Sequence, residues 1–322
     1  MYRGDQNLPH YLTISHLCKK CKSYAIIFDM NILYCGDQGI SRGILVSILS
    51  ILKHNVGVLH FYIMTIDYPG VKPFEAKTAR FLDELVKKTN AKSFVKLINA
   101  TKAFRANLPK KNMGTYFTPC AMLRLYMDKV PEFAKINKML YLDYDVVCRG
   151  DLVKFYDMDM KGVEVAGVLD IYGRRWYKYH GVLKRKNDVK EWVDIKDRPW
   201  SFLKQDYMNS GVMLFNLEEC RKTRMLERAR ELCANKRMLL PDQGALNRAI
   251  MRRRLVARKF NEQEERPRPD TVLHHFSNNF KFWPYFRVQK VKPFEVEKIH
   301  NILKIHEYDD ILKIYKKLEV KL

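Results

Sequence analysis

From residue 30 onward, the apolar residues of this sequence fall into two alternating patterns. In one, several mostly apolar residues follow one another, as in a buried strand; in the other, apolar positions recur at helical spacing. The runs predict strands at 31–37, 58–66, 94–98, 139–147, 163–169, 209–216 and 271–276. The spaced positions predict helices at 41–52, 73–86, 118–129, 218–234, 241–252 and 295–322. Strands that alternate with helices are typical of a doubly wound α/β domain with a mostly parallel sheet.

Local signals set some of the boundaries. Ser41 is expected to cap the first helix, and Pro73 suits the first turn of the second. Asn209 is expected in a turn that leads into the following strand. Residues 1–29 are polar and irregular, so we expect an N-terminal extension over 1–29, a main domain over 30–294 and a basic helical tail over 295–322. Docking of this tail on the domain is favoured over contact with an anionic membrane.

Two acids, Asp143 and Asp145, interrupt the apolar run at 139–147. A buried unpaired charge is very costly, and side chains two residues apart in a strand point to the same side. The two carboxylates could therefore hold one cation at the end of the strand. They could equally cap a solvated turn, and this stretch alone leaves both readings open.

Composition narrows the class of protein. The chain has 322 residues, of which 47% are hydrophobic, and no apolar run approaches the ~20 residues of a membrane span. Its seven scattered cysteines are typical of reduced thiols in a cytosolic protein, and Cys18 and Cys21 lack a second pair that would indicate zinc. The net charge of +23 indicates a partner of opposite sign: nucleic acid, anionic lipid or a phosphorylated substrate.

Residues 171–202 form the most irregular stretch of the chain. It carries Trp176, Tyr177, Tyr179, Trp192 and Trp200 among nine Lys/Arg and four Asp/Glu. Interleaved aromatic and cationic side chains could stack on sugar rings or bases and hold phosphates. An ordinary basic surface loop is the alternative, although structureless loops of this length are usually functional.

Several predicted elements end or begin with polar side chains that suit a phosphate-bearing ligand. They are Asp37, Asp143, Asp145, Asp170, Asn209, Asp242, Gln243 and His275. Ligands of open α/β sheets bind beyond the carboxyl ends of the strands, so one cleft could collect most of them. The sequence has neither a Gly-x-x-x-x-Gly-Lys-Ser/Thr loop nor a Gly-x-Gly-x-x-Gly fingerprint. We therefore expect a metal and Lys/Arg side chains, in place of a glycine-rich loop, to hold the phosphates.

In its ordered motifs the chain resembles glycosyltransferase family 8, the retaining transferases that include glycogenin and bacterial lipopolysaccharide galactosyl- and glucosyltransferases. The resemblance extends from Met30 to about Phe294. The motifs are Cys35-Gly-Asp37, Arg124, Leu142-Asp-Tyr-Asp-Val146, Asn209-Ser-Gly-Val212, Pro241-Asp-Gln243 and His275-Phe276. A lone Asp-x-Asp is weak, whereas the ordered set is specific. The resemblance implies a GT-A-type fold, with a Rossmann-like, mostly parallel twisted sheet flanked by helices.

The resemblance also implies a divalent cation that bridges the two phosphates of a UDP-sugar. Its implied ligands are Asp143, Asp145 and His275, and the implied ion is Mn²⁺, with Mg²⁺ as the alternative. Carboxylates with one imidazole suit such an ion. His274 is the adjacent alternative ligand, but a strand would turn it to the opposite face.

The other matched positions are implied to contact the donor. They are Cys35, Gly36, Asp37, Arg124, Tyr144, Asn209 and Ser210. Asp37 falls where the family recognises uracil, but the neighbouring family asparagine corresponds to Gly39, which puts part of the base contact in doubt. For Arg124 the alternative is a surface salt bridge, and for Asn209 and Asp170 it is an ordinary turn residue.

The closing motif of the family, His-x-x-Gly-x-x-Lys-Pro-Trp, is altered in this chain. Counting from His275 places its lysine at Lys281. A reading with an insertion places it at Lys292, in Lys292-Pro293-Phe294. Either lysine could bind the β-phosphate of the departing UDP, and the sequence leaves both open.

Retention of configuration requires either a protein nucleophile or attack by the acceptor from the face that the leaving group departs from. Gln243 occupies the family position discussed as the nucleophile, and an amide is a poor nucleophile. Same-face attack is therefore favoured, with Gln243, Asp242 and Asp170 as the catalytic residues that position the donor sugar. The departing diphosphate would accept the proton of the acceptor.

These observations predict a cytoplasmic, metal-dependent retaining hexosyltransferase that uses UDP-glucose or UDP-galactose. The expected acceptor is a glycan or glycolipid, and the basic tail could contact the anionic inner face of a membrane. One rival is a nucleic-acid-binding protein, which the charge of +23 favours. It leaves the strand-end acids unexplained, because they would repel a phosphate backbone without a metal. A second rival is an inactive glycosyltransferase-like binder of nucleotide sugars.

Overall fold

The computed structural model describes residues 29–114, 118–171, 206–238, 240–277 and 291–322. All but one residue of the predicted N-terminal extension lies outside these ranges. The aromatic and basic stretch at 172–202 and the candidate Lys281 also lie outside them.

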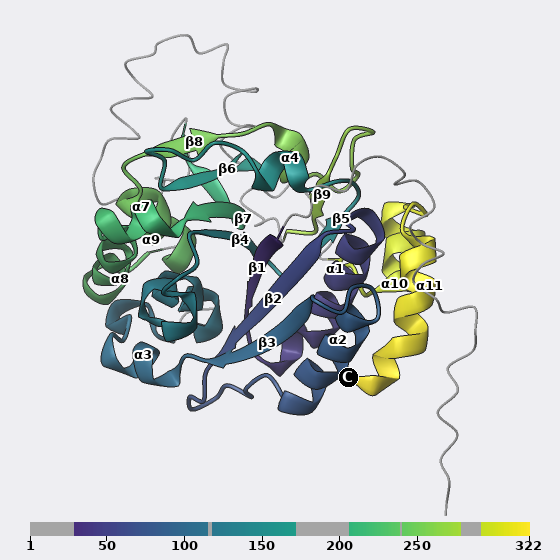
Figure 1. Cartoon of the computed structure of the whole chain (residues 1–322), viewed down its shortest axis with the longest axis horizontal. Coiled ribbons are helices and arrows are strands. Elements are labelled where there is room, and N and C mark those ends of the chain that lie inside the picture. The colour runs from purple at the N-terminus through teal and green to yellow at the C-terminus, as the bar shows by residue number, and fades with distance from the viewer. Residues whose placement is uncertain (1–28, 115–117, 172–205, 239, 278–290) are drawn as a thin grey trace, which may run out of the picture.

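The described strands form a large sheet and a small one. They are β1 (Asp29–Cys35), β2 (Val58–Thr65), β3 (Phe94–Asn99), β4 (Lys138–Leu142), β5 (Val146–Cys148), β6 (Val165–Leu169), β7 (Met208–Asn216), β8 (Arg253–Leu255) and β9 (Leu273–His275). The large sheet has the order β3-β2-β1-β4-β7-β6-β8, and β5 pairs with β9 beside it (Figure 1).

The large sheet is mostly parallel, as predicted. β1 to β4 pair in parallel, and so do β6 and β8. The exception is β7, which runs antiparallel to both of its neighbours, β4 and β6. Because of this reversal, the first residues of β7 lie beside the carboxyl end of β4, where Leu142 pairs with Val212.

Helices cover both faces of this sheet (Figure 1). The longer α-helices are α1 (Ser41–His54), α2 (Ala76–Lys87), α3 (Thr101–Ala106), α7 (Leu217–Lys222), α8 (Met225–Asn235), α9 (Pro241–Ala249) and α11 (Asp309–Leu318). Short elements are α4 (Val153–Tyr156) and α10 (Val296–Lys298), and the 3₁₀ helices include η3 (Gln38–Ile40), η5 (Pro119–Lys129) and η8 (Arg258–Phe260).

Two apolar clusters lie on the two sides of the sheet because side chains alternate along each strand. In β1, Ile32 and Tyr34 face a cluster completed by α1, α2 and α11. Leu33 and Cys35 face a second cluster, completed by α3, η5, α8 and α9. The strands of a sheet covered on both faces are apolar on both sides, which explains why they appear in the sequence as continuous runs.

Several predicted boundaries are wrong, each for a local reason. Ser41 is the first residue of α1 and makes no cap; instead Asp37 caps η3, because its Oδ1 accepts from the Gly39 N–H at 2.9 Å. Pro73 precedes α2 by three residues. The helix predicted at 118–129 is a 3₁₀ helix, and the one predicted at 218–234 is divided into α7 and α8 by Arg224, whose φ is 55°.

The segment predicted as a helical tail packs against the main domain. Most of its apolar residues are buried, and α11 lies beside α1 (Figure 1). The buried residues are Ile299, Leu303, Ile305, Tyr308, Ile311, Leu312, Tyr315 and Leu318. The apolar side of this segment is therefore used within the protein, and its lysines at 313, 316 and 317 are exposed.

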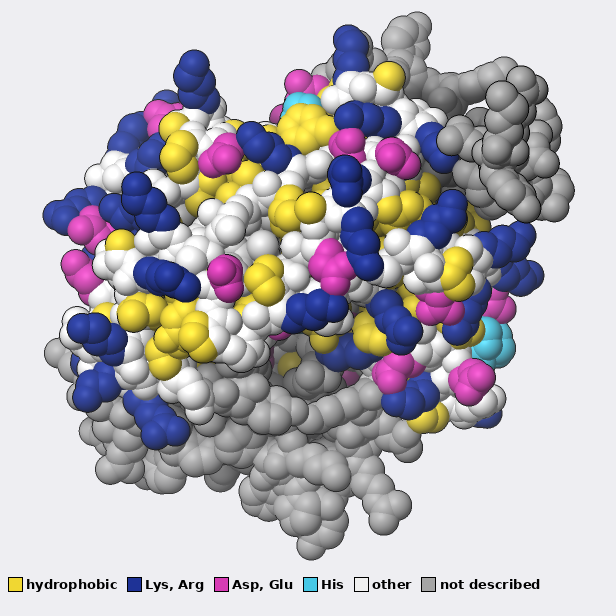
Figure 2. All heavy atoms as spheres, turned by 90° about the horizontal axis from the view of Figure 1, so that it is seen from below, with side chains coloured by type: hydrophobic (Ala, Val, Ile, Leu, Met, Phe, Trp, Pro, Cys, Tyr) yellow, Lys and Arg dark blue, Asp and Glu magenta, His cyan; other side chains and the backbone are white. Residues whose placement is uncertain are grey.

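On the face shown in Figure 2, Lys and Arg side chains alternate with Asp, Glu and apolar residues and do not gather into one patch. Among the described helices, none is both long and apolar enough to cross a bilayer.

Candidate active site

The two acids of the central motif lie at the carboxyl end of β4. The Val146 N–H donates to the Asp143 carbonyl at 3.2 Å, so the chain turns there and enters β5 of the small sheet. The single strand predicted at 139–147 is therefore wrong, and the acids lie in the turn between two strands. The Asp143 N–H donates to the Gly211 carbonyl at 2.8 Å, which ties this turn to β7.

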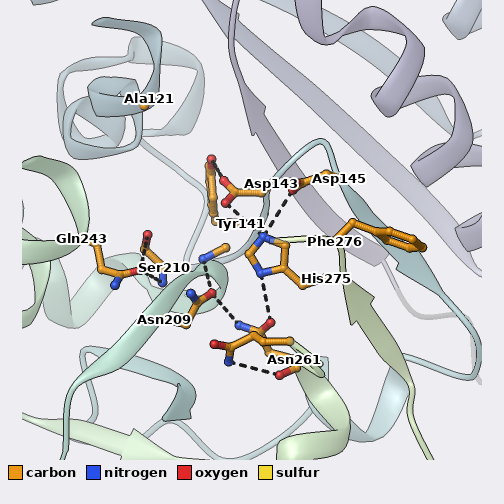
Figure 3. A network of polar contacts seen from close by, with 12 residues as sticks. Ala121, Tyr141, Asp143, Asp145, Asn209, Ser210, Gln243, Asn261, His275 and Phe276 are labelled. Atoms are coloured by element: carbon orange, nitrogen blue, oxygen red, sulfur yellow. Dashed lines mark hydrogen bonds and ion pairs between the residues drawn. The ribbon is translucent and has the colours of Figure 1, made fainter. Parts of the chain in front are cut away.

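His275 reaches these acids from β9. Its partner in the antiparallel register with β5 is Val146, the residue after Asp145. His275 Nε2 lies 3.3 Å from Asp145 Oδ1 and 3.6 Å from Asp143 Oδ2 (Figure 3). The ligand atoms of the three residues all lie within 4.8 Å of one another, so the three predicted metal ligands do come together.

Two further features fit these side chains to a cation. Asp145 Oδ1 is buried, and no described donor meets it with good hydrogen-bond geometry. A Cβ atom on Gly211 would lie 2.1 Å from His275 Cε1 and 2.8 Å from Asp143 Oδ2, so this glycine leaves the space in which the ligands converge. Two carboxylates and one imidazole form an oxygen-rich set that suits Mn²⁺ or Mg²⁺.

Lys292 balances the charge of Asp145. Its Nζ lies 2.5 Å from Asp145 Oδ2 and donates to the Phe276 carbonyl at 3.3 Å. Burial raises the pKa of Asp145, but Lys292 and His275 reverse this and hold it below the usual range of a carboxyl group. Burial lowers the pKa of Lys292, and Asp145 more than restores it. Lys292 therefore lies in the site as a charged ammonium, beside the candidate ligands.

Arg124 is a buried cation, not a surface arginine, with 3% of its surface exposed. It donates to Asp143 Oδ1 at 2.9 Å and to the Ser210 carbonyl at 2.7 Å. Its Nη2 also lies 3.3 Å from Asp242 Oδ2. Burial lowers the pKa of Arg124, but the neighbouring Tyr141, Asp143 and Asp242 raise it above its ordinary value. Arg124 therefore stays charged and joins the turn after β4 to β7 and α9.

Tyr141 was not among the predicted site residues. Its hydroxyl donates to Asp143 Oδ1 at 2.7 Å, and the Arg124 guanidinium lies 3.8 Å from its ring centroid. Asp143 Oδ1 is thus held by a hydroxyl and a guanidinium, which leaves Oδ2 directed to His275. In the sequence, Tyr141 is indistinguishable from the other large residues of a buried strand.

A directional chain of hydrogen bonds orients the His275 ring (Figure 3). Asn209 Oδ1 accepts from the Gly211 N–H at 3.0 Å, so its Nδ2 is the atom that donates to Asp170 Oδ2, at 3.1 Å. Asn209 Oδ1 also accepts from Asn261 Nδ2 at 2.9 Å. This leaves Asn261 Oδ1 to accept from His275 Nδ1 at 3.2 Å. With its Nδ1 hydrogen engaged, the His275 ring presents Nε2 to the two acids, as a ligating imidazole must.

Gln243 lies at the first turn of α9, beside Asp170. Its Oε1 accepts from the Ser210 N–H at 2.8 Å, and its Nε2 lies 3.3 Å from Asp170 Oδ2. The amide oxygen is therefore already engaged with the backbone of β7. Burial raises the pKa of the adjacent Asp242, and Asp143 raises it further, against the opposing effect of Arg124.

The predicted base-recognition residues lie at the end of β1. Asp37 Oδ2 accepts from the Thr118 hydroxyl at 3.3 Å, which connects it to the start of η5, the helix that carries Arg124. Cys35 is buried, and a Cβ on Gly36 would lie 2.2 Å from Ile40 Cδ1. Tyr144 packs over Gly43 of α1, and Lys292 Nζ lies 5.4 Å from its ring centroid.

His274 points away from the acids, as predicted. Its Nε2 donates to the Glu264 carbonyl at 2.9 Å, and its Nδ1 meets the Tyr308 hydroxyl at 2.7 Å. Burial lowers the pKa of His274 to about 3, so the ring is neutral at pH 7 and Nδ1 accepts from Tyr308. His274 thus connects β9 to the segment before α11.

A family model described as glycosyl transferase family 8 matches residues 31–286 of this chain. The lipopolysaccharide 1,2-glucosyltransferase of Escherichia coli is 24% identical over 313 residues, which cover 88% of this chain and 84% of the relative. The lipopolysaccharide 1,3-galactosyltransferase of Salmonella typhimurium is 26% identical over 243 residues, which cover 72% and 63%.

Solved structures show the same fold. A structure of the galactosyltransferase LgtC in complex with donor and acceptor sugar analogs has a TM-score of 0.60 and 15% identity, over 91% of this chain and all of LgtC. The glycosyltransferase GlyE of Streptococcus pneumoniae TIGR4 has a TM-score of 0.55 and 17% identity, over 91% of this chain and 64% of GlyE. These likenesses confirm the predicted GT-A-type fold.

Proposed function

Because the chain belongs to glycosyltransferase family 8, we propose that it is a retaining hexosyltransferase that takes glucose or galactose from a UDP-sugar. The observation that carries this proposal is the convergence of Asp143, Asp145 and His275, with Asp145 Oδ1 buried and without a hydrogen-bond partner among the residues that the structure describes. A metal-assisted donor site accounts for this arrangement, because Asp145 Oδ1 has no hydrogen-bond partner among the described residues although Lys292 pairs with Oδ2.

In the proposed site, Asp143, Asp145 and His275 hold a divalent cation, with Mn²⁺ as the expected ion. When bound, the cation supplies electrostatic neutralisation of the charge that develops on the departing diphosphate. Lys292 is the described side chain that we assign to the β-phosphate. Its ammonium is already at the site, where it pairs with Asp145.

We assign the donor sugar to the side of the site formed by Asp170, Asn209 and Gln243, with Asp242 beside them. The contacts of Gln243 support same-face attack. Its Oε1 accepts from the Ser210 N–H at 2.8 Å, so the amide oxygen is engaged and ill placed to form a bond to the sugar. We therefore assign Gln243 to positioning, with the departing diphosphate accepting the proton of the acceptor.

The proposed acceptor is a glycan or glycolipid. The lipopolysaccharide glycosyltransferases among the relatives of this chain support that class. A cytoplasmic enzyme that meets its acceptor at the anionic inner face of a membrane would use the exposed lysines of α11, because the apolar side of that helix is buried.

The test is calorimetric titration of UDP into the full chain with Mn²⁺ and again with a chelator. We expect metal-dependent UDP binding in the wild type and at least a ~100-fold weaker affinity in Asp145→Ala. Loss of a residue that only hydrogen-bonds to a metal ligand costs about 10–100-fold in metal affinity, and loss of the ligand itself should cost more. Asp270→Ala is the matched control, since its carboxylate is exposed and pairs with Arg268. Transfer from UDP-glucose and UDP-galactose, followed by NMR of the anomeric carbon, then tests the sugar and retention.

The contrary outcomes separate the rivals. No UDP binding in the presence of Mn²⁺ would overturn the donor site, and the charge of +23 would direct the next titration to an oligonucleotide. Metal-dependent UDP binding without transfer or hydrolysis of either sugar would identify an inactive member of the family.

A further inference from the structure

A second group of metal-ligating side chains lies in the turn that precedes α11, away from the candidate active site. His300 belongs to the short π-helix Ile299–Leu303, His306 to the following turn, and Asp309 opens α11. His300 Nε2 lies 2.6 Å from Asp309 Oδ1, and His306 Nδ1 lies 3.5 Å from Asp309 Oδ2. One ligand atom from each residue lies within 4.8 Å of the other two.

The backbone brings the two histidines together by an unusual path. The π-helix ends at Leu303, and the next residue, Lys304, has a φ of 56°, which is uncommon for a residue other than glycine. The Ile305 N–H then donates to the Ile299 carbonyl at 3.2 Å, which closes the turn. As a result the imidazoles of His300 and His306 stack, with ring centroids 4.7 Å apart and planes inclined by 24°. Single-turn π-helices of this kind occur frequently at functional sites.

The apolar residues within and beside this turn hold it in place. Ile299, Leu303, Ile305 and Tyr308 are buried in the main core. The turn is therefore anchored to the domain before any ligand binds, while the imidazole of His306 remains 65% exposed. A ligand set that is fixed on one side and open on the other admits an ion from solvent.

The neighbouring acids are neutralised by cations, whereas Asp309 is shared between imidazoles. Glu307 pairs with Arg149, and Asp310 pairs with Lys53. Among the described residues, the ion-pair partners of Asp309 are the two histidines, one for each carboxylate oxygen.

We propose that His300, His306 and Asp309 bind a divalent transition metal, with Zn²⁺ as the expected ion and water completing the coordination. Two imidazoles and a carboxylate are a common zinc ligand set, with bonds of about 2.0–2.2 Å, so that neighbouring ligands lie ~3.3 Å apart. The present separations bracket this distance.

This site differs in chemistry from the one at Asp143 and Asp145. The active-site set has two carboxylates and is largely buried, and its oxygen ligands suit Mn²⁺ or Mg²⁺. The turn before α11 offers two nitrogens and one oxygen close to solvent. Imidazole-rich sets favour Zn²⁺ over Mn²⁺, following the general order of affinities of these ions.

A metal at this turn would cross-link three residues within the C-terminal segment and so hold the turn in one conformation. Tyr308 lies between two of the ligands in sequence, and its hydroxyl bonds His274, the neighbour of His275 in β9. The bound ion would therefore stabilise the turn that contacts β9 through Tyr308 and His274. It would not itself contact the active site.

The experiment is calorimetric titration of ZnCl₂ into the chelator-treated full chain, with thermal unfolding at equal zinc as a second measurement. We expect one zinc to persist in Asp145→Ala, which lacks an active-site ligand. The same zinc should weaken at least about 100-fold in His306→Ala and in Asp309→Asn, as loss of a ligand requires. His54→Ala at the end of α1 and Cys18→Ser are the controls, and both should retain it. Zinc should raise the unfolding temperature of the wild type but not of His306→Ala.

Either of two results would overturn the proposal. One is zinc binding that His306→Ala and Asp309→Asn leave unchanged, since the ion would then lie elsewhere. The other is zinc that is lost in Asp145→Ala or Cys18→Ser, which would assign it to the active site or to the CxxC pair. His306 is largely exposed, so its replacement should leave the fold intact, and circular dichroism of the variant checks this.

Discussion

A missing side chain decides whether the candidate active site can form. At Gly211, β7 passes directly beneath His275 and Asp143, and a methyl group there would overlap both. The glycine is not needed for an unusual backbone conformation, because it lies within a regular strand. It is needed because it leaves room for two converging ligands.

Gly211→Ala should therefore abolish metal-dependent UDP binding while it destabilises the fold only moderately. The new methyl group must push the His275 ring or the Asp143 carboxylate aside, and overpacking of this kind costs about 1–3 kcal/mol. Calorimetry measures the loss of binding, and chemical denaturation measures the change in the free energy of unfolding. Gly150→Ala is the matched control, because its nearest neighbours would lie 3.7 Å from the added Cβ. UDP affinity unchanged in Gly211→Ala would contradict the proposed donor site.

At the scale of single residues, the sequence indicates the charged site residues well. It indicates poorly the uncharged residues that orient them by hydrogen bonds. Asp143 and Asp145 stand out because carboxylates are rare in apolar runs, and the family motif adds His275. Asn261 has no such signal: it is fully buried, yet it follows a short 3₁₀ helix in a polar stretch that resembles a surface loop. Its part in orienting His275 is visible only once segments distant in the chain lie together.

The sequence predicts whether a segment forms a helix or a strand more reliably than it predicts the kind of helix or a break within a strand. The apolar runs predict β1, β2, β3, β6 and β9 to within about two residues. The 3₁₀ character of η5 is not predictable, because most of its residues from Cys120 to Met127 are buried and show no single apolar face. The break between β4 and β5 is hidden for a similar reason, since apolar residues continue on both sides of the acidic turn.

The packing of α11 against α1 makes the C-terminal segment part of the folded domain. Leu312→Ala should lower the free energy of unfolding by about 2–5 kcal/mol, because Leu312 is 2% exposed and its removal leaves a cavity. Lys313→Ala, on the exposed side of the same helix, should change it by less than ~0.5 kcal/mol. Urea denaturation followed by circular dichroism measures both. Equal stability of the two variants would show that α11 contributes nothing to the fold.

For the molecule as a whole, the fold class follows from the sequence but the direction of β7 does not. A run of buried apolar residues is the same whether the strand runs parallel or antiparallel to its neighbours. The reversal has a direct effect on the site. It places the start of β7, with Asn209, Ser210 and Gly211, beside the end of β4, with Asp143. The prediction that Asn209 lies in a turn is wrong, because Asn209 is the second residue of this strand.

The described cysteines should all be inert in the native protein. Cys35, Cys120, Cys148, Cys220 and Cys233 are buried free thiols. Burial raises the pKa of Cys120 to about 11 and that of Cys148 to about 12. A thiol with a pKa near 11 is about 0.1% thiolate at pH 8, and only the thiolate reacts.

In a variant with Cys18→Ser and Cys21→Ser, a disulfide reagent at pH 8 should therefore titrate few thiols before unfolding and five in guanidinium. The native reaction should accelerate as the pH rises toward 11, since the raised pKa keeps the thiols protonated below it. Rapid native titration of any of the five at pH 8 would contradict their burial.

The pairing of β5 with β9 has a further consequence, which concerns time. Lys292 follows Asp143 by 149 positions (292 − 143), so at about 5–20 residues per second the ribosome adds it roughly 7 to 30 s later. For that interval the turn after β4 carries its two negative charges without the histidine or the lysine that later face them. In the cell, the proposed cation site can therefore form only after the second half of the chain, which contains His275 and Lys292, has been synthesised.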